Sequence, residues 1–348
     1  MKYITHWLTV VITLAVLVGL RFQDGGLTET ARLKSFDYLQ STDATVESKD
    51  IVIVEFDEKS IEAFGQWPWP RDYLADVVNH LRSQGAGLII MPILFSEEDR
   101  AGKDDVLAET IQGNGVIIAQ TGTTQTNKNA VPRGIAKIGD PIPWLFEWPG
   151  MLGPIPQLGQ SADGVGVLNI APERDGVVRR MPLIMTVAGE TYPIVKTDPN
   201  GQIWLRWNKQ FPAVSMMEAT QEHVQGKIVV IGLTAEGIGS TIAAPTGTEY
   251  AHTPVAVSLQ TIINGDNIVR SDLADTYELV YLFVIGMLLI IAARFFHYGV
   301  VAGLIILIGA GTVYGSVHIY STRLLLFDFS WPVITTVLVG LHAVFNRF

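Results

Sequence analysis

Long apolar runs are the feature that most constrains what this chain can fold into. Three lie in the C-terminal third: "YELVYLFVIGMLLIIAA" (Tyr277 to Ala293), "VVAGLIILIGAGTVYGSV" (Val300 to Val317) and "FDFSWPVITTVLVGLHAVF" (Phe327 to Phe345). Each is close to the roughly 20 residues that a helix needs to cross a bilayer. Because a helix satisfies its own backbone hydrogen bonds in lipid, these runs predict three consecutive transmembrane helices.

A fourth apolar run, "YITHWLTVVITLAVLVGLRF", begins at Tyr3. It fits either another transmembrane helix or a cleaved signal peptide, and the lack of an A-x-A-like site after its apolar core favours an uncleaved anchor. We therefore predict an N-terminal transmembrane anchor over residues 1–21, one extracytoplasmic domain over 22–276 and a three-helix transmembrane bundle over 277–348.

The charges that flank these runs bear on the topology. Four spans return both termini to one side, so that Lys2, Arg294 and Arg347 would be cytoplasmic, whereas Arg21 and Arg323 would lie outside. That is a weak positive-inside bias, and long domains are translocated largely regardless of charge. We expect the large domain to lie in the periplasm or outside the cell.

Composition excludes several kinds of chemistry. The formal charge of −10, with no basic stretch, argues against nucleic acid as a partner. The chain has no cysteine, and its seven histidines lack metal-ligand spacing. His252 with nearby Glu249 is interpreted as a surface pair, and "GLTAEGIGS" lacks the lysine of a phosphate-binding loop. We expect no catalytic residue, no metal and no other cofactor.

Strands and helices alternate along the outer domain. "IVIVEFD", "GAGLIIMPILF", "GVIIAQT" and "KIVVIG" are apolar runs typical of strands buried on both faces of a parallel sheet. "RDYLADVVNHL", "DDVLAETIQ" and "PVAVSLQTII" have the pattern of helices. The predicted fold class is α/β, with a mixed, largely parallel sheet flanked by helices in an extracytoplasmic domain, plus four transmembrane helices, one N-terminal and three C-terminal.

Two segments of this domain are less regular. "GVGVLNIAPERDGVVRRMPLIMTVAGE" is interpreted as a hairpin whose turn contains Asp175 and Gly176. The segment from Thr121 to Ser161 has no periodicity, but it is too apolar for a disordered linker. We expect its apolar residues to be buried in the domain's own core or against a partner; they are Ile142, Trp144, Leu145, Phe146, Trp148, Met151 and Leu152.

"GQWPWPRDYLADVV" is the most distinctive short stretch of the chain. Its two prolines fix backbone angles, and Pro70 directly before Arg71 is a natural helix entrance, so the corner is a stiff elbow. Trp67, Trp69 and Arg71 could also stack on or clamp an anionic or aromatic ligand. Both interpretations remain open at the level of sequence.

Asp57 is the fourth candidate for ligand binding. It ends the strand "IVIVEFD", at the edge where open α/β sheets place their ligands. An aspartate there also commonly caps the start of a helix. The candidate ligand-binding residues are thus Asp57, Trp67, Trp69 and Arg71.

Taken together, the motifs resemble one known family. "SFDYLQ", "IVIVEFDEKSIEAFGQWPWPR", "ILFSEED", "GVGVLNIAPERDGVVRRMPLI" and "QGKIVVIGLTAEGIGS", followed by three apolar runs, are similar to the second type of CHASE domain, a cyclase and histidine-kinase associated sensory extracellular domain. The resemblance covers nearly the whole chain. It implies a receptor input module in the bacterial inner membrane, facing the periplasm, which passes an unidentified signal to cytoplasmic cyclase, kinase or GGDEF-type domains; a small periplasmic ligand is one possible partner.

The chain also departs from the family's pattern. Met91 and Ser240 stand where the family usually has acidic residues, and "TPVAVSL" from Thr253 replaces a common "PGVEVHA". The sequence ends at Phe348, where the resemblance implies that an output domain should begin. We therefore expect that the chain is not itself an enzyme.

Two functions remain open. One is a sensor that relays a periplasmic signal to a separate partner; the other is a non-catalytic structural subunit of a membrane-anchored assembly, derived from such a sensor. Expected partners are a second copy, another membrane or periplasmic protein, and membrane lipid. "TETARLKSFDYL" would be a signal-transmitting helix or a plain connector. Four glycines could serve packing within the bundle or against a partner: Gly303, Gly309, Gly311 and Gly315.

Overall fold

A computed structural model describes residues 2–125, 147–170, 172–182, 185–187, 190–192 and 202–346. The chain forms two compact units. The helical unit combines Met1–Ala44 with Ile268–Phe348, and the α/β unit is Thr45–Asn267. The α/β unit is therefore shorter at both ends than the outer domain expected over 22–276, because residues 22–44 and 268–276 pack with the helices.

A largely parallel sheet forms the centre of the α/β unit, which confirms the expected α/β class. Neighbouring strands β13, β2, β14, β3 and β4 are parallel in that spatial order, and β4 also pairs with parallel β7 and antiparallel β6. The strands are β2 (Ile51–Phe56), β3 (Leu88–Leu94), β4 (Val116–Thr123), β6 (Gly150–Leu152), β7 (Gly164–Val167), β13 (Ala213–Ser215) and β14 (Ile228–Leu233).

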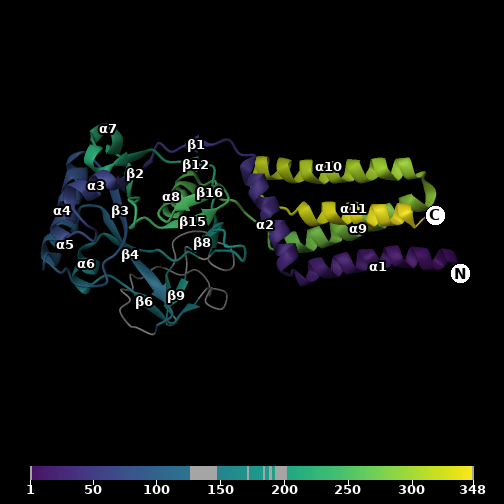
Figure 1. Cartoon of the computed structure of the whole chain (residues 1–348), viewed down its shortest axis with the longest axis horizontal. Helices are drawn as coiled ribbons and strands as arrows, with labels where there is room; N and C mark the ends of the chain where they lie inside the picture. The colour runs from purple at the N-terminus through teal and green to yellow at the C-terminus, as the bar shows by residue number, and fades with distance from the viewer. Residues whose placement is uncertain are drawn as a thin grey trace. The chain divides into compact units, whose positions relative to one another are not determined.

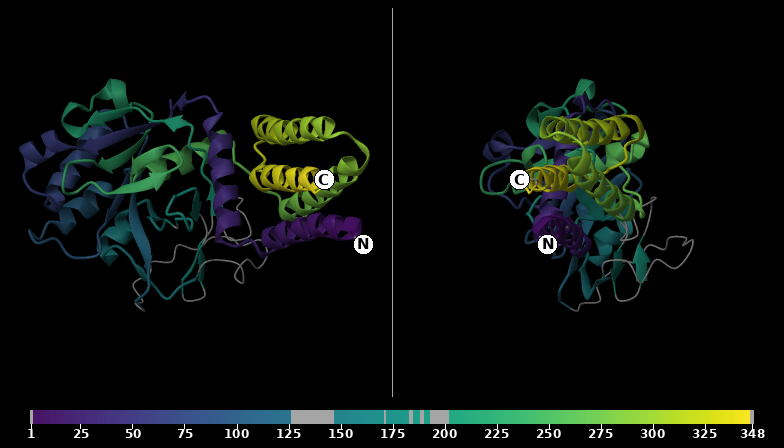
Figure 2. Two further views of the ribbon diagram at one scale, coloured as in Figure 1. Left: turned by 45° about the vertical axis from the view of Figure 1, so that its right-hand side comes forward. Right: turned by 90° about the vertical axis from the view of Figure 1, so that its right-hand side faces the viewer.

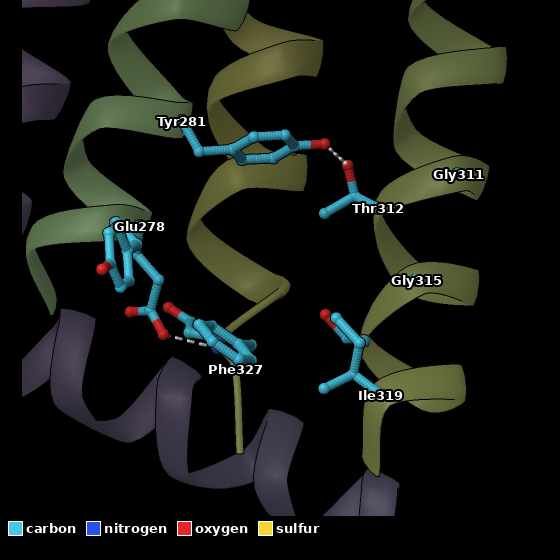
Figure 3. Close-up of a pocket in the computed structure, with 10 residues that line it drawn as sticks. Glu278, Tyr281, Gly311, Thr312, Gly315, Ile319 and Phe327 are labelled. Carbon is cyan, nitrogen blue, oxygen red and sulfur yellow. Dashed lines mark hydrogen bonds between the residues drawn. The ribbon is translucent and has the colours of Figure 1, made fainter. Parts of the chain in front are cut away.

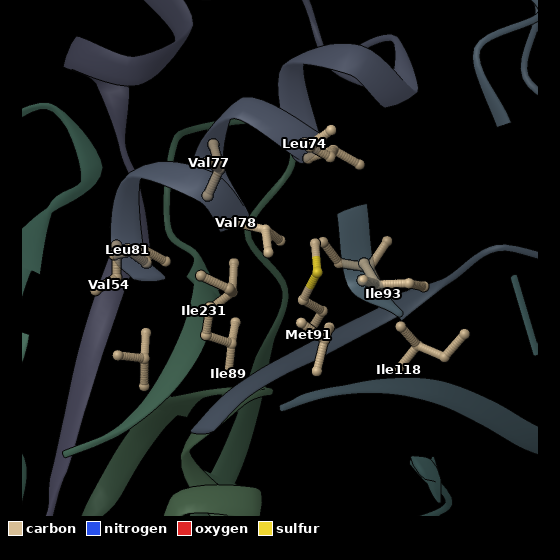
Figure 4. Packing of buried hydrophobic residues seen from close by; sticks show 14 of the residues in the cluster. Val54, Leu74, Val77, Val78, Leu81, Ile89, Met91, Ile93, Ile118 and Ile231 are labelled. Carbon is tan, nitrogen blue, oxygen red and sulfur yellow. The ribbon is translucent and has the colours of Figure 1, made fainter. Parts of the chain in front are cut away.

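Helices cover both faces of this sheet (Figure 1). Alternate strand residues point to opposite faces, so Val54 packs under α4 whereas Ile53 packs with Ala256 of α8. Figure 4 shows the apolar face of α4 on the strands, with Leu74, Val77, Val78 and Leu81. The helices are α3 (Glu58–Phe64), α4 (Arg71–Ser83), α5 (Asp104–Ile111), α6 (Pro156–Ser161), α7 (Gln221–Val224) and α8 (Thr253–Asn264).

Short strands make up the rest of the α/β unit. β1 (Val46–Glu47) pairs with β12 (Lys209–Gln210), β8 (Arg180–Pro182) with β11 (Gln202–Trp204), and β15 (Thr241–Ala244) with β16 (Gly247–Tyr250). β9 (Met185–Val187) lies between β10 (Glu190–Tyr192) and β5 (Glu147–Trp148).

The expected hairpin around Asp175 is wrong, although its turn is present. Gly176 has a φ of 79°, and its N–H donates to the carbonyl of Glu173. The flanking strands do not pair with each other, because β7 joins the central sheet beside β4 and β8 pairs with β11. That arrangement buries Met181 and Ile203 in a second, smaller core.

The irregular segment between Thr121 and Ser161 falls partly outside the described residues. Four of its apolar residues are outside the described residues: Ile142, Trp144, Leu145 and Phe146. Met151 is in β6 and is fully buried. Trp148 is half-buried and lies so close to Gly122 that a Cβ added to this glycine would be 2.5 Å from the indole. Met151 and Trp148 thus pack within the α/β unit itself.

The helical unit consists of α1 (Lys2–Gln23), α2 (Gly26–Ser41), α9 (Ala274–Phe295), α10 (Tyr298–Arg323) and α11 (Ser330–Phe345). Among the described residues, α9 and α10 are long and apolar enough to cross a membrane. The apolar helix α11 is shorter, with 16 residues. The Trp7–Gln23 part of α1 meets α2 at a bend of 77°, and the two together are the third candidate span. Two of the four expected spans are therefore supported by length and composition.

Helices α1, α9, α10 and α11 lie side by side, with the start of α1 and the end of α11 at the same end of the unit (Figures 1 and 2). Gly286 and Gly340 allow the closest approaches, since an added Cβ would meet Leu14 at 2.3 Å and Ile305 at 2.5 Å. A Cβ on any of the four glycines of α10 singled out by the sequence would meet nothing within 4 Å. Those four, Gly303, Gly309, Gly311 and Gly315, therefore do not mediate close packing among the described helices.

Candidate functional site

The central sheet splits at its carboxyl edge. β14 pairs with β3 only as far as Val230 and Ile90, while its pairing with β2 continues to Leu233. The register of β3 against β4 shifts between Ile90 and Leu94. Pro92 lies inside this irregular stretch and has no N–H to donate to a ladder. Neighbouring parallel strands thus separate at the edge where α/β folds bind ligands.

Two pockets lie at this split and share the lining residues Pro92, Leu168 and Leu233. The larger, here called the corner pocket, has a volume of about 500 Å³ and is walled by the "WPWPR" stretch and by the loop after β3. The smaller, here called the His252 pocket, has a volume of about 220 Å³.

Trp69 is part of the hydrophobic core. It is 1 % exposed, and its Nε1 donates a hydrogen bond to the carbonyl of Gly65 at 2.8 Å. Its ring lies 4.7 Å from that of Phe56 and 5.1 Å from that of Phe64, between ring centroids. Trp67 is half-buried and meets Trp69 edge-on at 5.3 Å. The corner is thus a packed elbow, and Trp67 also presents a surface to the corner pocket.

Arg71 begins α4 and holds the loop after β3. Its Nη2 donates to the carbonyl of Glu97 at 3.3 Å, and its Nε is 3.5 Å from a carboxylate oxygen of Asp104. The guanidinium lies 4.7 Å from the centre of the Phe95 ring, and the backbone N–H donates to Asp99. Arg71 lines the corner pocket together with charged residues of the loop, which are Glu97, Glu98, Asp99 and Arg100.

Asp57 caps α3, which is one of the two roles that the sequence left open. Its carboxylate accepts hydrogen bonds from the backbone N–H of Ser60 at 3.1 Å, from the Ser60 hydroxyl and from the Ser215 hydroxyl. Burial alone would raise the pKa of Asp57, but these hydrogen bonds outweigh it and lower the pKa. Burial, together with the charge of Asp57, raises the pKa of Glu55. Asp57 does not line the corner pocket.

His252 is buried, so its interpretation as a surface pair with Glu249 is wrong. It is 8 % exposed, and its ring stacks on that of Tyr250 with an interplanar angle of 10°. Glu249 instead accepts a hydrogen bond from Thr246. The imidazole lies directly on Gly232, where an added Cβ would be 2.6 Å from the ring. A glycine in β14 therefore makes room for the histidine. The residues next to His252 in the sequence do not predict this burial.

The helical unit holds a buried ion cluster that sequence reasoning missed. Nη2 of Arg21 is 2.7 Å from a carboxylate oxygen of Glu278 and 2.5 Å from Asp275. Arg270 contacts the same two carboxylates at 2.9 Å and 2.7 Å. The side chains of Arg21 and Glu278 are 3 % and 4 % exposed. A glutamate inside an apolar run was the available signal, because charges there are costly and are retained for a partner or a function.

A pocket of about 310 Å³ adjoins this cluster, between α9, α10 and the segment before α11 (Figure 3). Glu278 accepts a hydrogen bond from the backbone N–H of Asp328 at 2.8 Å, and the hydroxyls of Tyr281 and Thr312 are 2.7 Å apart. Within the described residues, no group of three or more histidine, aspartate or glutamate side chains is arranged to hold a metal ion.

Comparison with known proteins adds one match. A family model described as the CHASE2 domain matches residues 11–293, which include the whole α/β unit, α2 and most of α1 and α9. No curated protein and no solved structure gives a significant match.

Proposed function

Because the chain belongs to the CHASE2 domain family, whose members are sensory domains, we propose that it is the input module of a bacterial receptor in the inner membrane. The α/β unit lies in the periplasm and binds a small molecule at the split carboxyl edge of its sheet. The helical unit anchors the chain and passes the signal to a separate partner protein.

The observation that carries this proposal is the corner pocket. Its volume of about 500 Å³ falls within the roughly 300–1,000 Å³ of small-molecule sites. It combines apolar walls, among them Trp67 and Leu168, with the charged groups of the loop after β3. Its place beyond the ends of β3 and β14 is where ligands bind in α/β sheets.

The buried ion cluster supports a role in transmission. Arg32 of α2 pairs with Asp24 at 2.7 Å, and Asp24 also contacts Arg21, which is bound to Glu278 of α9. After α2, Asp43 accepts a hydrogen bond from Tyr320 of α10. Removing one partner of a buried ion pair costs roughly 3–5 kcal/mol, so the buried Arg21–Glu278 pair holds α1 and α9 together. The more exposed Arg32–Asp24 pair adds α2 to them more weakly. The chain passes between the helical unit and the α/β unit twice, at residues 44–45 and 267–268.

Ligand binding at the corner pocket is tested by closing it. Ala101 lines the pocket from the exposed loop, so Ala101→Trp fills it without disturbing the core. A small-molecule library is assayed by thermal shift, because a ligand that binds the folded state raises its stability by mass action. Compounds that stabilise the parent chain should lose their effect in Ala101→Trp and keep it in Ala63→Trp, which changes an exposed residue of α3. Equal shifts in both variants would place the ligand elsewhere.

The proposed membrane topology has four spans with both termini in the cytoplasm. The chain has no cysteine, so single cysteines report their own side of the membrane. A membrane-impermeant maleimide applied to intact spheroplasts should label Glu222→Cys and Thr322→Cys but not Lys2→Cys. Labelling of Lys2→Cys at the same rate as Glu222→Cys would refute the topology.

The alternative function is a structural subunit of a membrane-anchored assembly, which binds a second copy, another membrane or periplasmic protein, or lipid. The open glycines of α10 favour it, because small residues that no neighbouring helix covers suit close packing against a partner helix. Light scattering on the detergent-solubilised chain tests this idea. A dimer that Gly311→Leu reduces to a monomer supports it, and a monomeric parent chain contradicts self-association.

A further inference from the structure

The imidazole of His252 lines the His252 pocket. Among the described residues, none forms a hydrogen bond with the imidazole of His252, whose ring contact is the stacking on Tyr250. A neutral imidazole has one N–H donor and one nitrogen acceptor. The ring nitrogens of His252 are not among the fully buried, unpartnered polar atoms of the described residues, so they remain accessible to a small molecule in the pocket.

A glycine in the neighbouring strand β14 leaves space for this ring. Gly232 lies in the part of β14 that no longer pairs with β3, and its missing side chain leaves the space that the imidazole occupies. The ring also stacks on that of Tyr250 of β16. The pocket is lined by Pro92, Leu168, Ile170, Leu233, Ser240, Ala251, His252 and Val255.

We propose that the His252 pocket binds the uncharged, mainly apolar end of a small molecule, and that His252 forms a hydrogen bond with a hydroxyl or amide group on it. The proposal rests on the proposed function in one respect, since it places the ligand at the same sheet edge. It does not depend on any signal reaching a partner.

The chemistry of the walls selects this ligand class. Ser240 and His252 are the polar residues among those that line the pocket, and none of the lining residues is acidic or basic apart from the imidazole. Burial lowers the pKa of His252 to about 4, so the ring is neutral at physiological pH. A charged ligand would be desolvated without an opposite charge to compensate it. A single histidine also falls short of the three or four ligands that zinc requires.

Size narrows the class further. The volume of about 220 Å³ is below the roughly 300–1,000 Å³ of sites for drug-sized ligands, so the pocket accepts one ring or a short branched chain. Its neighbour, the corner pocket, shares Pro92, Leu168 and Leu233 with it and carries charged residues. A larger ligand would therefore place its uncharged end at His252 and a polar end at the corner.

Nuclear magnetic resonance of the detergent-solubilised full chain tests the proposal. Histidine is labelled with ¹³C at Cε1, and the His252 signal is identified as the one that disappears in His252→Phe. The probe is cyclohexanol. Its matched analogues are methylcyclohexane, which lacks the hydroxyl, and cyclohexanecarboxylate and cyclohexylammonium, which carry a charge.

Cyclohexanol should shift the His252 signal saturably, at concentrations where methylcyclohexane binds roughly tenfold more weakly and the two charged analogues leave the signal unchanged. Gly232→Ala displaces the imidazole and should abolish the saturable shift. The control Gly166→Ala should retain it, because a Cβ there makes only ordinary contacts. An unshifted signal, or equal shifts with the charged analogues, would overturn the proposal.

The outcome is separable from that of the proposed function. Ala101→Trp closes the corner pocket but leaves the lining of the His252 pocket intact. Cyclohexanol binding in that variant would support the His252 pocket even if no ligand stabilises the corner. If Ala101→Trp abolishes ligand binding at the corner pocket while cyclohexanol leaves the His252 signal of the parent chain unchanged, this inference is refuted and the proposed function stands.

Discussion

The tryptophan corner and the His252 pocket lie at the same sheet edge and differ in how their polar groups are used. Trp69 donates its indole N–H to Gly65, and Arg71 is bound to Glu97 and stacked on Phe95. His252 is also buried, yet no described residue forms a hydrogen bond with its imidazole. The polar groups of the conspicuous motif are thus used largely within the fold, whereas the imidazole of an inconspicuous histidine has no hydrogen-bond partner among the described residues. A sequence motif marks what a fold needs as readily as what a ligand needs.

Truncating Trp69 should have the largest effect on stability. Trp69→Ala is expected to lower the free energy of unfolding by about 3–5 kcal/mol, because it leaves a cavity in the main core. Trp67→Ala should cost less, since Trp67 is only half-buried. Urea denaturation followed by circular dichroism measures both. A loss of stability below about 1 kcal/mol for Trp69→Ala would contradict the conclusion that Trp69 is part of the hydrophobic core.

The pH dependence of stability should reveal His252. Its pKa is about 4 in the folded chain and 6.5 as the ordinary value. As the pH falls from 6.5 towards 4, the unfolded state takes up the proton first, so the folded state loses stability. The loss should be on the order of 3 kcal/mol, since each pKa unit corresponds to about 1.4 kcal/mol. His252→Phe should lack this part of the pH dependence, and identical curves for the two proteins would contradict a buried neutral ring.

Replacing Arg71 should have an intermediate effect on stability, and it distinguishes the elbow interpretation of the corner from the ligand-binding one. Arg71→Ala removes one hydrogen bond and one ion pair whose side chains are each 12 % exposed, so a loss of roughly 1–2 kcal/mol is expected. The same urea titration measures it. Unchanged stability together with a lost ligand response would show that Arg71 acts on a ligand rather than on the loop.

The cap formed by Asp57 should give the smallest effect. Asp57→Ala is expected to cost about 1 kcal/mol, as is typical for loss of a helix N-cap. The folded-state pKa of Asp57 lies below its ordinary value, so its contribution is present above about pH 4 and is lost as the pH falls through the folded pKa. The difference between parent and variant should therefore shrink in acid. A difference that is constant down to pH 3 would rule out a charged cap.

Local sequence patterns predicted the individual strands and helices, whereas contacts between distant parts of the chain determine the order and pairing of the strands. "IVIVEFD" and "KIVVIG" became β2 and β14 as expected. The insertion of β14 between β2 and β3 follows from a pairing across most of the α/β unit, which no local pattern encodes. For the same reason the turn at Gly176 was predictable, whereas the pairing of β8 with β11 was not.

The candidate site shows the same division. The cap formed by Asp57 was foreseeable because Ser60 is only three residues away. The burial of His252 depends on Gly232, which is twenty residues earlier in the chain and on another element. Arg21 and Glu278 are 257 residues apart, so their pairing in the helical unit had no local signature beyond a charge in an apolar run.

Hydrogen–deuterium exchange tests the central claim, that the split carboxyl edge of the sheet is where this chain binds its ligand. The full chain in detergent is compared with and without a concentrated small-molecule extract of the source cells. Slower exchange is expected in peptides that contain Pro92, Leu168, Leu233 and His252, and unchanged exchange around β1 and β12, which form a separate two-stranded sheet. Protection elsewhere, with none at these four residues, would contradict it.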